Sequence, residues 1–349
     1  MEKVLVGMSG GVDSSVCASL LKEKGFSVAG VTLSLIENNT ADETNISDAK
    51  KVCDNLGIEH FAVDLSKDFK QNVINNFIDE YINGRTPNPC IVCNRYIKFG
   101  KMLEIAKEWG FSKIATGHYA TVREKDARYL LCKAKDETKD QSYVLYCLTQ
   151  EQLASVQFPL GELSKSQVRE IAESKKLVNA KKKDSQDICF VPDGDYASFI
   201  ENTANYISDT GDYVNLKGEK IGQHKGVIHY TIGQRKGLGI ALGKPAFVID
   251  KNPITNQVVL GDEEYLFYKK VLVENVNFIP FDNLENEMKV CAKLRYRHKE
   301  QPAVIKPLGN GQVLVEFDEA QRAPSSGQAA VFYDGDIVVG GGTIVKGIE

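Results

Sequence analysis

The sequence predicts an α/β protein in which a doubly wound parallel sheet is followed by a small β-rich module and a C-terminal β-barrel. Three observations support this fold. Apolar runs alternate with helical patterns in the first half, glycines become dense after residue 205, and short alternating runs follow from residue 270 onward. Strand–helix alternation is typical of right-handed crossover units and a parallel sheet with helices on both faces. We expect three domains, at residues 1–204, 205–268 and 269–349.

The first domain is expected to contain four strands separated by helices. Apolar runs rich in Val and Leu predict buried strands at residues 3–8, 27–35, 59–64 and 113–116. Apolar residues at helical spacing predict one helix that ends before Gly25 and further helices at 48–56, 66–82, 97–109, 141–148 and 165–177. Ser66 is the expected cap of the helix that begins there, and Ser164 forms a capping box with Gln167. Two prolines within residues 83–94 predict a loop.

The last two domains show a β pattern. Helical periodicity is lost between residues 209 and 243, where glycines are frequent. Downstream, strands are predicted at 271–273, 289–296, 313–317, 329–333 and 337–339. Short strands separated by Gly, Asn, Asp and Pro are typical of a small barrel or sandwich.

Composition narrows the class of protein. The chain has 349 residues, of which 42% are hydrophobic and 26% charged, with a net charge of −4. This balance disfavours disorder, collagen and coiled coil. No apolar stretch approaches the roughly 18 residues that span a bilayer, and residues 1–7 are too short and too polar for a signal peptide. Eight cysteines are too sparse for a disulfide scaffold. We expect a cytoplasmic protein with reduced thiols and no membrane association.

A glycine-containing loop separates the first predicted strand from the first predicted helix. Gly10 and Gly11 permit a tight turn whose N–H groups point into one concavity, and the helix adds its positive N-terminal end. Serines within residues 9–15 add hydroxyl groups. The sequence therefore predicts a phosphate-binding loop, in which Asp13 holds Mg²⁺ or fixes the loop. For the two glycines alone, a plain turn with a serine cap is the alternative. The Gly-Lys-Ser/Thr ending of a Walker loop is absent.

Residues 9–15 resemble the pyrophosphate-binding loop of the PP-loop ATPases, which adenylate a substrate oxygen. Further motifs lie at residues 86–94, 115–119, 139–143, 187–190 and 230–239. In this order they resemble the motifs of the tRNA-specific 2-thiouridylases (the MnmA/TrmU family). The resemblance implies an ATP-dependent tRNA sulfurtransferase. Such an enzyme adenylates the C2 oxygen of the wobble uridine, transfers a persulfide sulfur to form 2-thiouridine, and releases AMP and pyrophosphate.

Sulfur transfer requires accessible thiolates. Cys93 follows two prolines in the predicted loop, and Cys189 lies near Pro192. The resemblance implies that Cys189 carries the persulfide. It also implies that Cys93 is the nucleophile toward that persulfide and forms a disulfide with Cys189 as sulfur leaves. Apart from Cys90, the other cysteines lie within apolar patterns and are expected to be buried. They are Cys17, Cys53, Cys132, Cys147 and Cys291.

Cys90 is a departure from the common family pattern, which has an aspartate usually assigned general acid/base duty. The change removes that base and adds a third thiol, three residues before Cys93. Two hypotheses rank equally. Cys90 is a redox thiol in a variant of the mechanism, or it holds a 4Fe–4S cluster with Cys93 and Cys189 that leaves one iron open to sulfide. A zinc site, which lacks a fourth ligand, and simple packing rank behind them.

The resemblance also implies an ATP site with Mg²⁺. It assigns nucleotide contacts to Gly7, Met8, Ser9, Gly10, Gly11, Val12, Asp13, Ser14, Leu33 and Gly117. Leu33 replaces a frequent methionine, which keeps the apolar slot for adenine, whereas the usual aromatic residue is absent from residues 34–36. Gly117 ends the fourth predicted strand, at the edge where open parallel sheets bind ligands. A core position for Leu33 and a plain turn at Gly117 are the structural alternatives.

RNA binding requires cations and groups that read splayed bases. Residues 181–183, 235–236 and 295–299 supply cations, although a lysine run is usually a solvated face. The resemblance assigns contacts with the target base to Asn88, Pro89 and Cys90. It assigns other tRNA contacts to His118, Lys139, Asp140, Gln141, Arg295, Tyr296 and Gln328. For His118 alone, a hydrogen-bonded structural histidine is the alternative.

The implied partners are tRNA, through its anticodon stem-loop, and a sulfur-donor protein, either a relay protein or a cysteine desulfurase. Two other functions fit parts of the sequence. Another PP-loop ligase that forms AMP, or an amidotransferase, has no need of Cys93 and Cys189. A non-catalytic RNA-binding or sulfur-relay protein has no need of an intact loop at residues 9–15.

Overall fold

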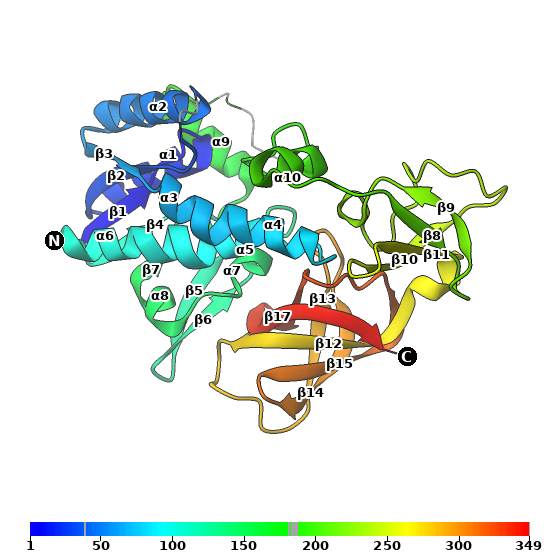
Figure 1. The fold of residues 1–349 in the computed structure, drawn as a ribbon. Helices are drawn as coiled ribbons and strands as arrows, with labels where there is room; N and C mark the ends of the chain where they lie inside the picture. The colour runs from blue at the N-terminus through cyan, green and yellow to red at the C-terminus, as the bar shows by residue number, and fades with distance from the viewer. Residues whose placement is uncertain (38–39, 181, 183–187, 349) are drawn as a thin grey trace.

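The computed structural model describes residues 1–37, 40–180, 182 and 188–348, and its strands form three sheets (Figure 1). The first sheet has the strand order β3-β2-β1-β4-β7, and its pairings are all parallel. The strands are β1 (Lys3–Gly7), β2 (Ser27–Ser34), β3 (Glu59–Asp64), β4 (Lys113–Ala115) and β7 (Val156–Gln157). The doubly wound parallel sheet predicted from the sequence is confirmed, with β7 as an additional edge strand.

Helices cover both faces of this sheet because successive side chains of a strand point to opposite faces. Val4 and Val6 of β1 pack in one hydrophobic cluster, whereas Leu5 packs in another. Three helices contribute to the first cluster: α1 (Val12–Glu23), α2 (Thr40–Leu56) and α9 (Lys165–Ser174). On the other face lies α6 (Met102–Glu108). The predicted capping box at Ser164 and Gln167 is present at the start of α9.

The helix predicted over residues 66–82 forms in three pieces. They are α3 (Ser66–Phe69), a π-helical turn η1 (Lys70–Ile74) and α4 (Asn75–Ile82). The predicted cap is wrong, because Ser66 is the first helical residue and its buried hydroxyl has no hydrogen-bond partner. The side chain of Asp64, two residues earlier, accepts the Ser66 N–H at 2.9 Å instead.

The loop predicted over residues 83–94 becomes helical before it ends. Helix α5 (Pro89–Cys93) continues into a π-helical stretch, η2 (Asn94–Lys101), and then into α6. The Asn88 side chain accepts the Cys90 N–H at 3.1 Å, and proline at the first helical position needs no N–H partner. The second proline therefore starts a helix, and the expectation that Cys93 lies in a loop is wrong.

The glycine-rich module follows α10 (Tyr196–Ala204) and forms a four-stranded sheet of order β10-β11-β8-β9 within the described residues. Its strands are β8 (Gly211–Val214), β9 (Lys220–His224), β10 (Phe247–Asn252) and β11 (Gln257–Gly261). Short 3-10 turns, η3 (Val227–His229) and η4 (Glu263–Leu266), complete it. The expected small β-rich module is present between the parallel sheet and the barrel.

The last part of the described chain is a closed six-stranded barrel, as predicted. It consists of β12 (Phe267–Phe278), β13 (Met288–Lys293), β14 (Gln301–Gly309), β15 (Gln312–Arg322), β16 (Ala329–Asp334) and β17 (Ile337–Ile348). Pairing of β12 with β17 closes it. An unpredicted hairpin, β5 (Thr121–Lys125) and β6 (Arg128–Cys132), joins the same sheet through a pair between Cys132 and Ile337.

Two short helices follow the β5–β6 hairpin along the chain. α7 (Ser142–Leu145) is shorter than the predicted helix at 141–148, and α8 (Gln150–Ser155) was not predicted. Barrel groups take over the backbone carbonyls that a longer α7 would have used. Asn277 Nδ2 donates to the carbonyl oxygens of Tyr146 at 2.7 Å and Leu148 at 3.1 Å. The buried Tyr143 hydroxyl donates to the Ala329 carbonyl at 2.9 Å.

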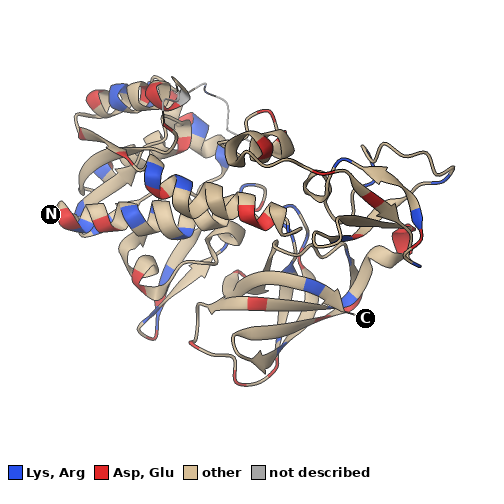
Figure 2. Ribbon diagram, in the orientation of Figure 1, with Lys and Arg blue, Asp and Glu red and all other residues tan. Residues whose placement is uncertain are grey.

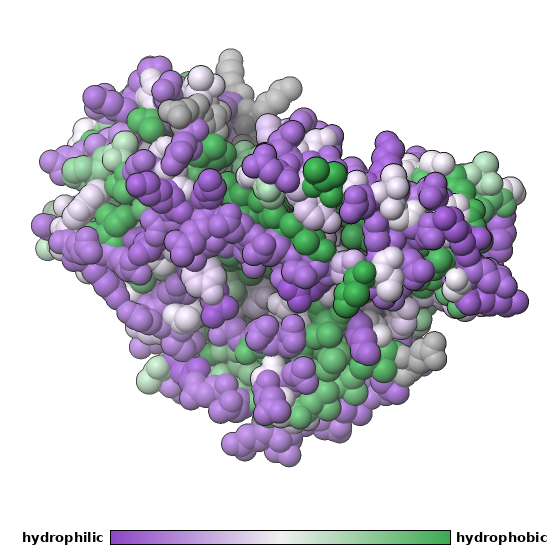
Figure 3. All heavy atoms as spheres, viewed as in Figure 1, coloured by the Kyte–Doolittle hydropathy of each residue, from purple (hydrophilic) through white to green (hydrophobic). Residues whose placement is uncertain are grey.

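The surface is largely hydrophilic on the face drawn in Figure 3, where hydrophobic side chains occur as separate patches. Figure 2 shows Lys and Arg interspersed with Asp and Glu along the ribbon in that orientation. Within the described ranges, no helix has both the length and the apolar character that crossing a membrane requires.

We predict that Tyr143→Phe destabilises the protein. The change leaves the buried Ala329 carbonyl without the Tyr143 donor, which costs about 1–2 kcal/mol of unfolding free energy. Urea unfolding monitored by circular dichroism measures the loss. Tyr265→Phe is the control, because Tyr265 is exposed, and it should change stability by less than about 0.5 kcal/mol. Equal effects of the two substitutions would contradict the assigned contact.

Candidate active site

The phosphate-binding loop predicted at residues 9–15 joins β1 to the N-terminus of α1. Gly10 has φ of +68°, and a Cβ atom there would lie 2.8 Å from the Asn45 carbonyl oxygen. Gly11 is the N-cap of α1. The Ser14 hydroxyl accepts the Ser9 N–H at 3.2 Å and donates to the Gly11 carbonyl at 3.2 Å. These bonds fold the loop over the helix start, where unpaired N–H groups and the helix dipole favour an anion.

Asp13 fixes this loop through groups that the sequence did not connect with it. Lys165 Nζ, at the start of α9, lies 2.7 and 2.9 Å from the two carboxylate oxygens of Asp13. The Tyr119 hydroxyl donates to the same carboxylate at 2.9 Å. Both oxygens are therefore occupied by protein donors, which favours the loop-fixing role of Asp13 over direct coordination of Mg²⁺.

Asn179 is a second contact that sequence reasoning missed. Its side chain is only 6% exposed, and Nδ2 donates to the Gly10 carbonyl at 3.0 Å and to the Ser15 hydroxyl at 2.9 Å. Asn179 lies 169 residues after Gly10, and no local pattern in the sequence marks it as a partner of the loop. Lys165 had one weak signal, since it lies within the capping box of α9.

The predicted adenine slot lies beside the loop. Met8 and Val31 are buried, and the Thr32 hydroxyl donates to the Met8 carbonyl at 2.9 Å. Leu33 is partly buried and packs against two hydrophobic clusters, so its core alternative is present in the fold. A Cβ on Gly117 would lie 2.8 Å from the Ser14 nitrogen, which means that only glycine lets this turn approach the loop so closely.

His118 comes directly after Gly117, and its side chain is buried in the protein. Its ring is 8% exposed and lies 5.6 Å from the Phe99 ring and 6.1 Å from the Phe158 ring. Nδ1 hydrogen-bonds with the Thr116 hydroxyl at 2.8 Å. Burial, together with the nearby positive charge of Lys98, holds the pKa of His118 well below its usual value. The imidazole is therefore neutral at physiological pH, and its contact with tRNA stays a prediction.

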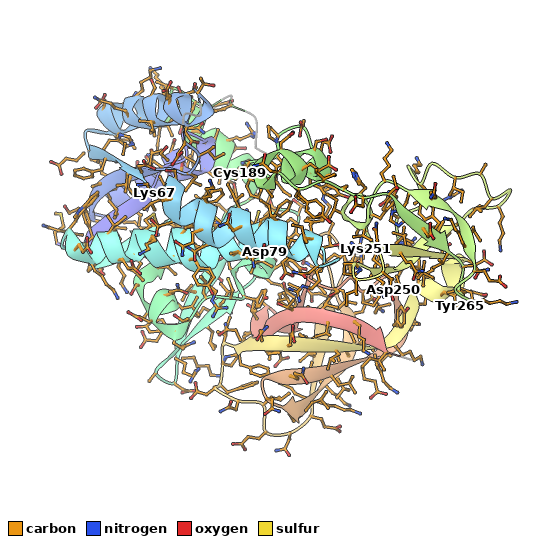
Figure 4. All side chains as sticks on the ribbon, viewed as in Figure 1. Lys67, Asp79, Cys189, Asp250, Lys251 and Tyr265 are labelled. Carbon is orange, nitrogen blue, oxygen red and sulfur yellow. The ribbon has the colours of Figure 1, made fainter. Side chains whose placement is uncertain are left out.

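The three cysteines of the predicted sulfur site differ in exposure. Cys90 and Cys189 are exposed, whereas Cys93 is buried. Cys189 lies where the chain leaves the first part of the fold for α10 (Figure 4). Its neighbour Phe190 packs in the same hydrophobic cluster as Cys93, and the Phe190 ring contacts Phe77 with 5.2 Å between centroids. This cluster anchors the Cys189 segment beside the helix that carries Cys93.

Electrostatics also connect the three sulfurs. The pKa of Cys93 is raised to about 12, mainly by burial and in smaller part by negative charge on Cys189 or Cys90. Burial also raises the pKa of Cys189, and a charge on Cys90 adds to that effect. A negative charge on one of these sulfurs therefore disfavours ionisation of the others, as expected for thiols that lie close together.

Lys98 is the cation that opposes these effects, and the sequence analysis did not single it out. Its positive charge lowers the pKa of both Cys93 and Cys189. Lys98 is half-buried in η2, and in the described part of the chain no carboxylate forms an ion pair with it. Gln152 Nε2 supports this π-helical stretch by donating to the carbonyls of Arg95 at 3.1 Å and Phe99 at 2.9 Å. π-Helical segments of this kind occur frequently at functional sites.

The other cysteines follow the prediction with one exception. Cys17, Cys53, Cys132 and Cys147 are buried, whereas Cys291 is only half-buried. Among the residues that the structure describes, no group of three or more His, Cys, Asp and Glu side chains is arranged to hold a metal ion. The hypothesis that Cys90, Cys93 and Cys189 hold a 4Fe–4S cluster, ranked equal with a redox role for Cys90, stays a prediction.

The barrel holds the segment that carries the predicted base contacts. Gln328 Nε2 donates to the Thr86 carbonyl at 2.7 Å, and the Thr86 N–H donates to the Ser326 carbonyl at 2.8 Å. Asn88 is half-buried and Pro89 is buried. A Cβ on Gly327 would lie 2.9 Å from the Thr86 nitrogen. Gln328 thus fixes the approach to α5 in this structure, and its contact with tRNA stays a prediction.

Several of the other predicted tRNA contacts are engaged within the protein. Asp140 Oδ1 accepts the Ala134 N–H at 2.9 Å, and Gln141 Oε1 accepts the Tyr119 N–H at 2.9 Å. Arg295 donates to the carbonyls of Ile232 and Ala323, at 3.2 and 3.0 Å. The exposed Tyr296 donates to the Asp140 carbonyl at 3.1 Å. Lys139 is half-buried.

The predicted basic segments are only partly brought together. Lys182 lies 3.0 Å from the Asp48 carboxylate, and residues 181 and 183 lie outside the described residues. Arg235 and Lys236 are exposed in the glycine-rich module. Residue 187 of the motif at 187–190 also lies outside the described part of the chain.

Comparison with known proteins decides the family. Residues 2–193, 198–262 and 268–344 match models described as the tRNA methyl transferase HUP domain, the tRNA methyl transferase PRC-barrel domain and the aminomethyltransferase beta-barrel domain. The tRNA-specific 2-thiouridylase MnmA 1 of Clostridium botulinum (strain Okra / Type B1) is 51% identical over 344 residues, which cover 98% of each chain. The chain belongs to the MnmA family of tRNA-specific 2-thiouridylases. The family resemblance predicted from the motifs is confirmed.

Other MnmA proteins show the same relationship along the whole chain. MnmA 1 of Thermoanaerobacter sp. (strain X514) is 50% identical over 360 residues, covering 99% of each chain. A crystal structure of a 4-thiouridine synthetase–RNA complex with bound ATP aligns with 58% of this chain and 50% of the synthetase, with a TM-score of 0.37 and 18% identity. The family assignment rests on the MnmA relatives and the domain matches.

We predict that Lys98→Met makes Cys189 in this MnmA protein less reactive at neutral pH. Removing the positive charge raises the pKa of Cys189, so the pH profile of its alkylation by iodoacetamide should move to higher pH. Mass spectrometry of the Cys189 peptide measures the rate, which we expect to fall several-fold at pH 7.5. Lys101→Met is the matched control, because Lys101 lies on η2 but bonds Glu104 at 3.0 Å. An unchanged profile for Lys98→Met would contradict the role given to this cation.

Proposed function

We propose that this chain is an ATP-dependent tRNA 2-sulfurtransferase that converts the wobble uridine of tRNA to 2-thiouridine in the cytoplasm. One observation carries the proposal. A phosphate-binding loop and two cysteines lie in the first part of a chain that is 51% identical, over 98% of its length, to a tRNA-specific 2-thiouridylase. In this proposal residues 1–204 perform the chemistry, and residues 205–268 and 269–349 grip the tRNA.

The reaction begins with activation of the base, because the C2 carbonyl of uracil is a poor electrophile. The C2 oxygen attacks the α-phosphate of ATP, and pyrophosphate leaves. The loop at residues 9–15 would hold the departing pyrophosphate with its N–H groups, and Lys165 and Asn179 would keep the loop in shape. Because the Asp13 carboxylate is already paired with Lys165, we infer that Mg²⁺ enters on the phosphates of ATP rather than on this side chain.

Adenine would occupy the slot beside Leu33, and the turn at Gly117 would line the phosphates. Support for this placement comes from the close approach of Gly117 to Ser14, since a side chain at that position would push the turn away from the loop. The neighbouring His118 is neutral and buried, which suits a role in holding the turn. The proposed nucleotide site thus runs from the loop at residues 9–15 to the turn that precedes the sulfur site.

Sulfur transfer is assigned to Cys93 and Cys189. The terminal sulfur of a Cys189 persulfide attacks C2, and AMP leaves with its oxygen. Cys93 then attacks the Cys189 sulfur, which releases the thiolated base and joins Cys93 to Cys189 in a disulfide. Burial raises the pKa of Cys93, so its thiol is protonated at neutral pH. We infer that binding of tRNA activates it, with Lys98 as the nearby cation.

The tRNA must present its uridine as a flipped base, because Cys93 is buried. Asn88, Pro89 and Cys90 would contact that base, and the barrel residues Arg295, Tyr296 and Gln328 would lie against the anticodon stem-loop. The hydrogen bonds of Gln328 to the segment before α5 support this arrangement. A cysteine desulfurase or a relay protein would load sulfur onto Cys189, whose exposure suits transfer from another protein. A ligase that uses ammonia is disfavoured by the full-length match to MnmA proteins.

We predict that Cys189→Ser abolishes thiolation of tRNA but retains tRNA-dependent release of pyrophosphate within about twofold, because adenylation precedes the sulfur step. Thiolated tRNA is measured on mercury-containing gels, and pyrophosphate by a coupled assay. Cys291→Ser, a change to a half-buried barrel cysteine, should leave both activities intact. Thiolation by Cys189→Ser at the wild-type rate would refute the persulfide assignment. Absence of tRNA-stimulated pyrophosphate release by the wild type would favour a non-catalytic sulfur-relay protein.

A further inference from the structure

Cys90 and Cys93 occupy the same short helix, and the geometry of that helix suits a bond between them. Cys90 is the second residue of α5 and Cys93 is the last. Residues three apart on a helix have Cβ atoms about 5–6 Å apart, whereas a disulfide brings them to about 3.5–4.5 Å. A small adjustment at the helix start, where the Asn88 cap holds the Cys90 N–H, is enough to close the difference.

The two thiols of this helix differ in their access to solvent. Cys90 is exposed, whereas Cys93 is 7% exposed and packs in the hydrophobic cluster that also contains Ile97 and Phe190. A reductant in solution can therefore reach the Cys90 sulfur but not the Cys93 sulfur. Cys189 is also exposed, and Phe190 anchors its segment in the cluster beside Cys93.

The proposed reaction leaves Cys93 and Cys189 joined by a disulfide. Cys189 cannot accept another sulfur until that bond is broken. In an attack on the disulfide, the thiolate with the lower pKa leaves more readily. Cys93 is buried in an apolar cluster, where a departing thiolate is poorly solvated, whereas Cys189 is exposed to water. An attack on the Cys93 sulfur, which expels Cys189, is therefore favoured over an attack on the Cys189 sulfur, which would expel Cys93.

We propose that Cys90 is the resolving thiol of this enzyme, which moves the disulfide from the Cys93–Cys189 pair to the Cys90–Cys93 pair. The inference rests on the proposed function. The Cys90 thiolate attacks the Cys93 sulfur, the Cys93–Cys189 bond breaks, and Cys189 leaves as a thiolate that takes up a proton from solvent. The proton lost by Cys90 also goes to solvent. One disulfide is exchanged for another, so this step requires no oxidant or reductant.

The cycle is then completed by an external dithiol reductant. Its thiolate attacks the exposed Cys90 sulfur, releases Cys93, and returns the helix to two thiols while the reductant becomes a disulfide. Cys189 is free to be loaded with sulfur before this reduction takes place. Transient catalytic disulfides of this kind are compatible with a reducing cytoplasm. The exchange gives the cysteine at position 90 a chemical task that an aspartate could not perform.

The experiment maps disulfides after one round of thiolation. Persulfide-loaded protein is mixed with ATP and tRNA without reductant, quenched in acid, alkylated with N-ethylmaleimide and analysed by peptide mass spectrometry. The disulfide yield is expressed per molecule of thiolated tRNA, so that a slower variant can still be compared. Wild-type protein should contain the Cys90–Cys93 disulfide and alkylated Cys189, whereas Cys90→Ser should contain the Cys93–Cys189 disulfide. Cys291→Ser is the control and should match the wild type.

A steady-state assay with limiting dithiol reductant tests the consequence. For Cys90→Ser, the ratio of the steady-state rate to the rate of its own first turnover should fall about tenfold below the wild-type ratio. A wild-type protein that keeps the Cys93–Cys189 disulfide while Cys90 is alkylated would overturn the proposal. So would an anaerobically purified enzyme whose activity requires iron bound by the three cysteines.

A second measurement separates this inference from the proposed function. Protein oxidised with diamide in the absence of ATP and tRNA should contain the Cys90–Cys93 disulfide in the wild type and the Cys93–Cys189 disulfide in Cys90→Ser. This result is expected even if the chain acts on another substrate. If the wild type thiolates tRNA but diamide never joins Cys90 to Cys93, the resolving role is wrong while the proposed function stands.

Discussion

The sulfur-bearing helix α5 keeps its position because the residues on either side of it hydrogen-bond with distant parts of the chain. Before the helix, Gln328 of the barrel donates to the Thr86 carbonyl at 2.7 Å. After it, the Asn94 side chain donates to the Val144 carbonyl in α7 at 2.9 Å. Helix α7 is itself bonded to the barrel by Tyr143. α5 is the first turn of a longer helical segment that continues through η2 and α6, and these tertiary bonds fix that end, where Cys90 and Cys93 lie.

This arrangement connects the barrel to the chemistry. Under the proposed function, the same barrel face that grips the tRNA also fixes the segment that meets the target base. The turn at Gly117 provides a second connection, because it packs against Ser14 of the phosphate-binding loop and continues into His118. The charge of Lys98 acts on His118 and on the two reactive sulfurs. Nucleotide and sulfur sites are thus linked through a short series of packed and electrostatic contacts.

Desolvation sets the protonation state of the proposed site before substrate binds. Cys93 and His118 are both buried, and burial keeps both neutral at physiological pH. An oxidant in solution therefore meets the exposed Cys90 and Cys189 before it meets the buried, neutral Cys93. Lys98 carries the compensating positive charge, and its position on a π-helical stretch is stabilised by Gln152. The sequence did not reveal this residue, because a single lysine within an amphipathic pattern has no distinguishing local signal.

The amino-acid sequence by itself determined the alternation of strands and helices, the glycine turn at Gly10, the capping box at Ser164 and the short strands of the barrel. These features depend on side-chain periodicity and on hydrogen bonds between residues a few positions apart, which local sequence specifies. Only the tertiary structure decided that Lys165 pairs with Asp13 and that Asn179 bonds Gly10, across 152 and 169 residues. It also decided that α7 stops at Leu145, because Asn277 of the barrel bonds the carbonyls that follow. Such partners are selected by packing and by the need to pair buried polar groups, which sequence separation does not encode.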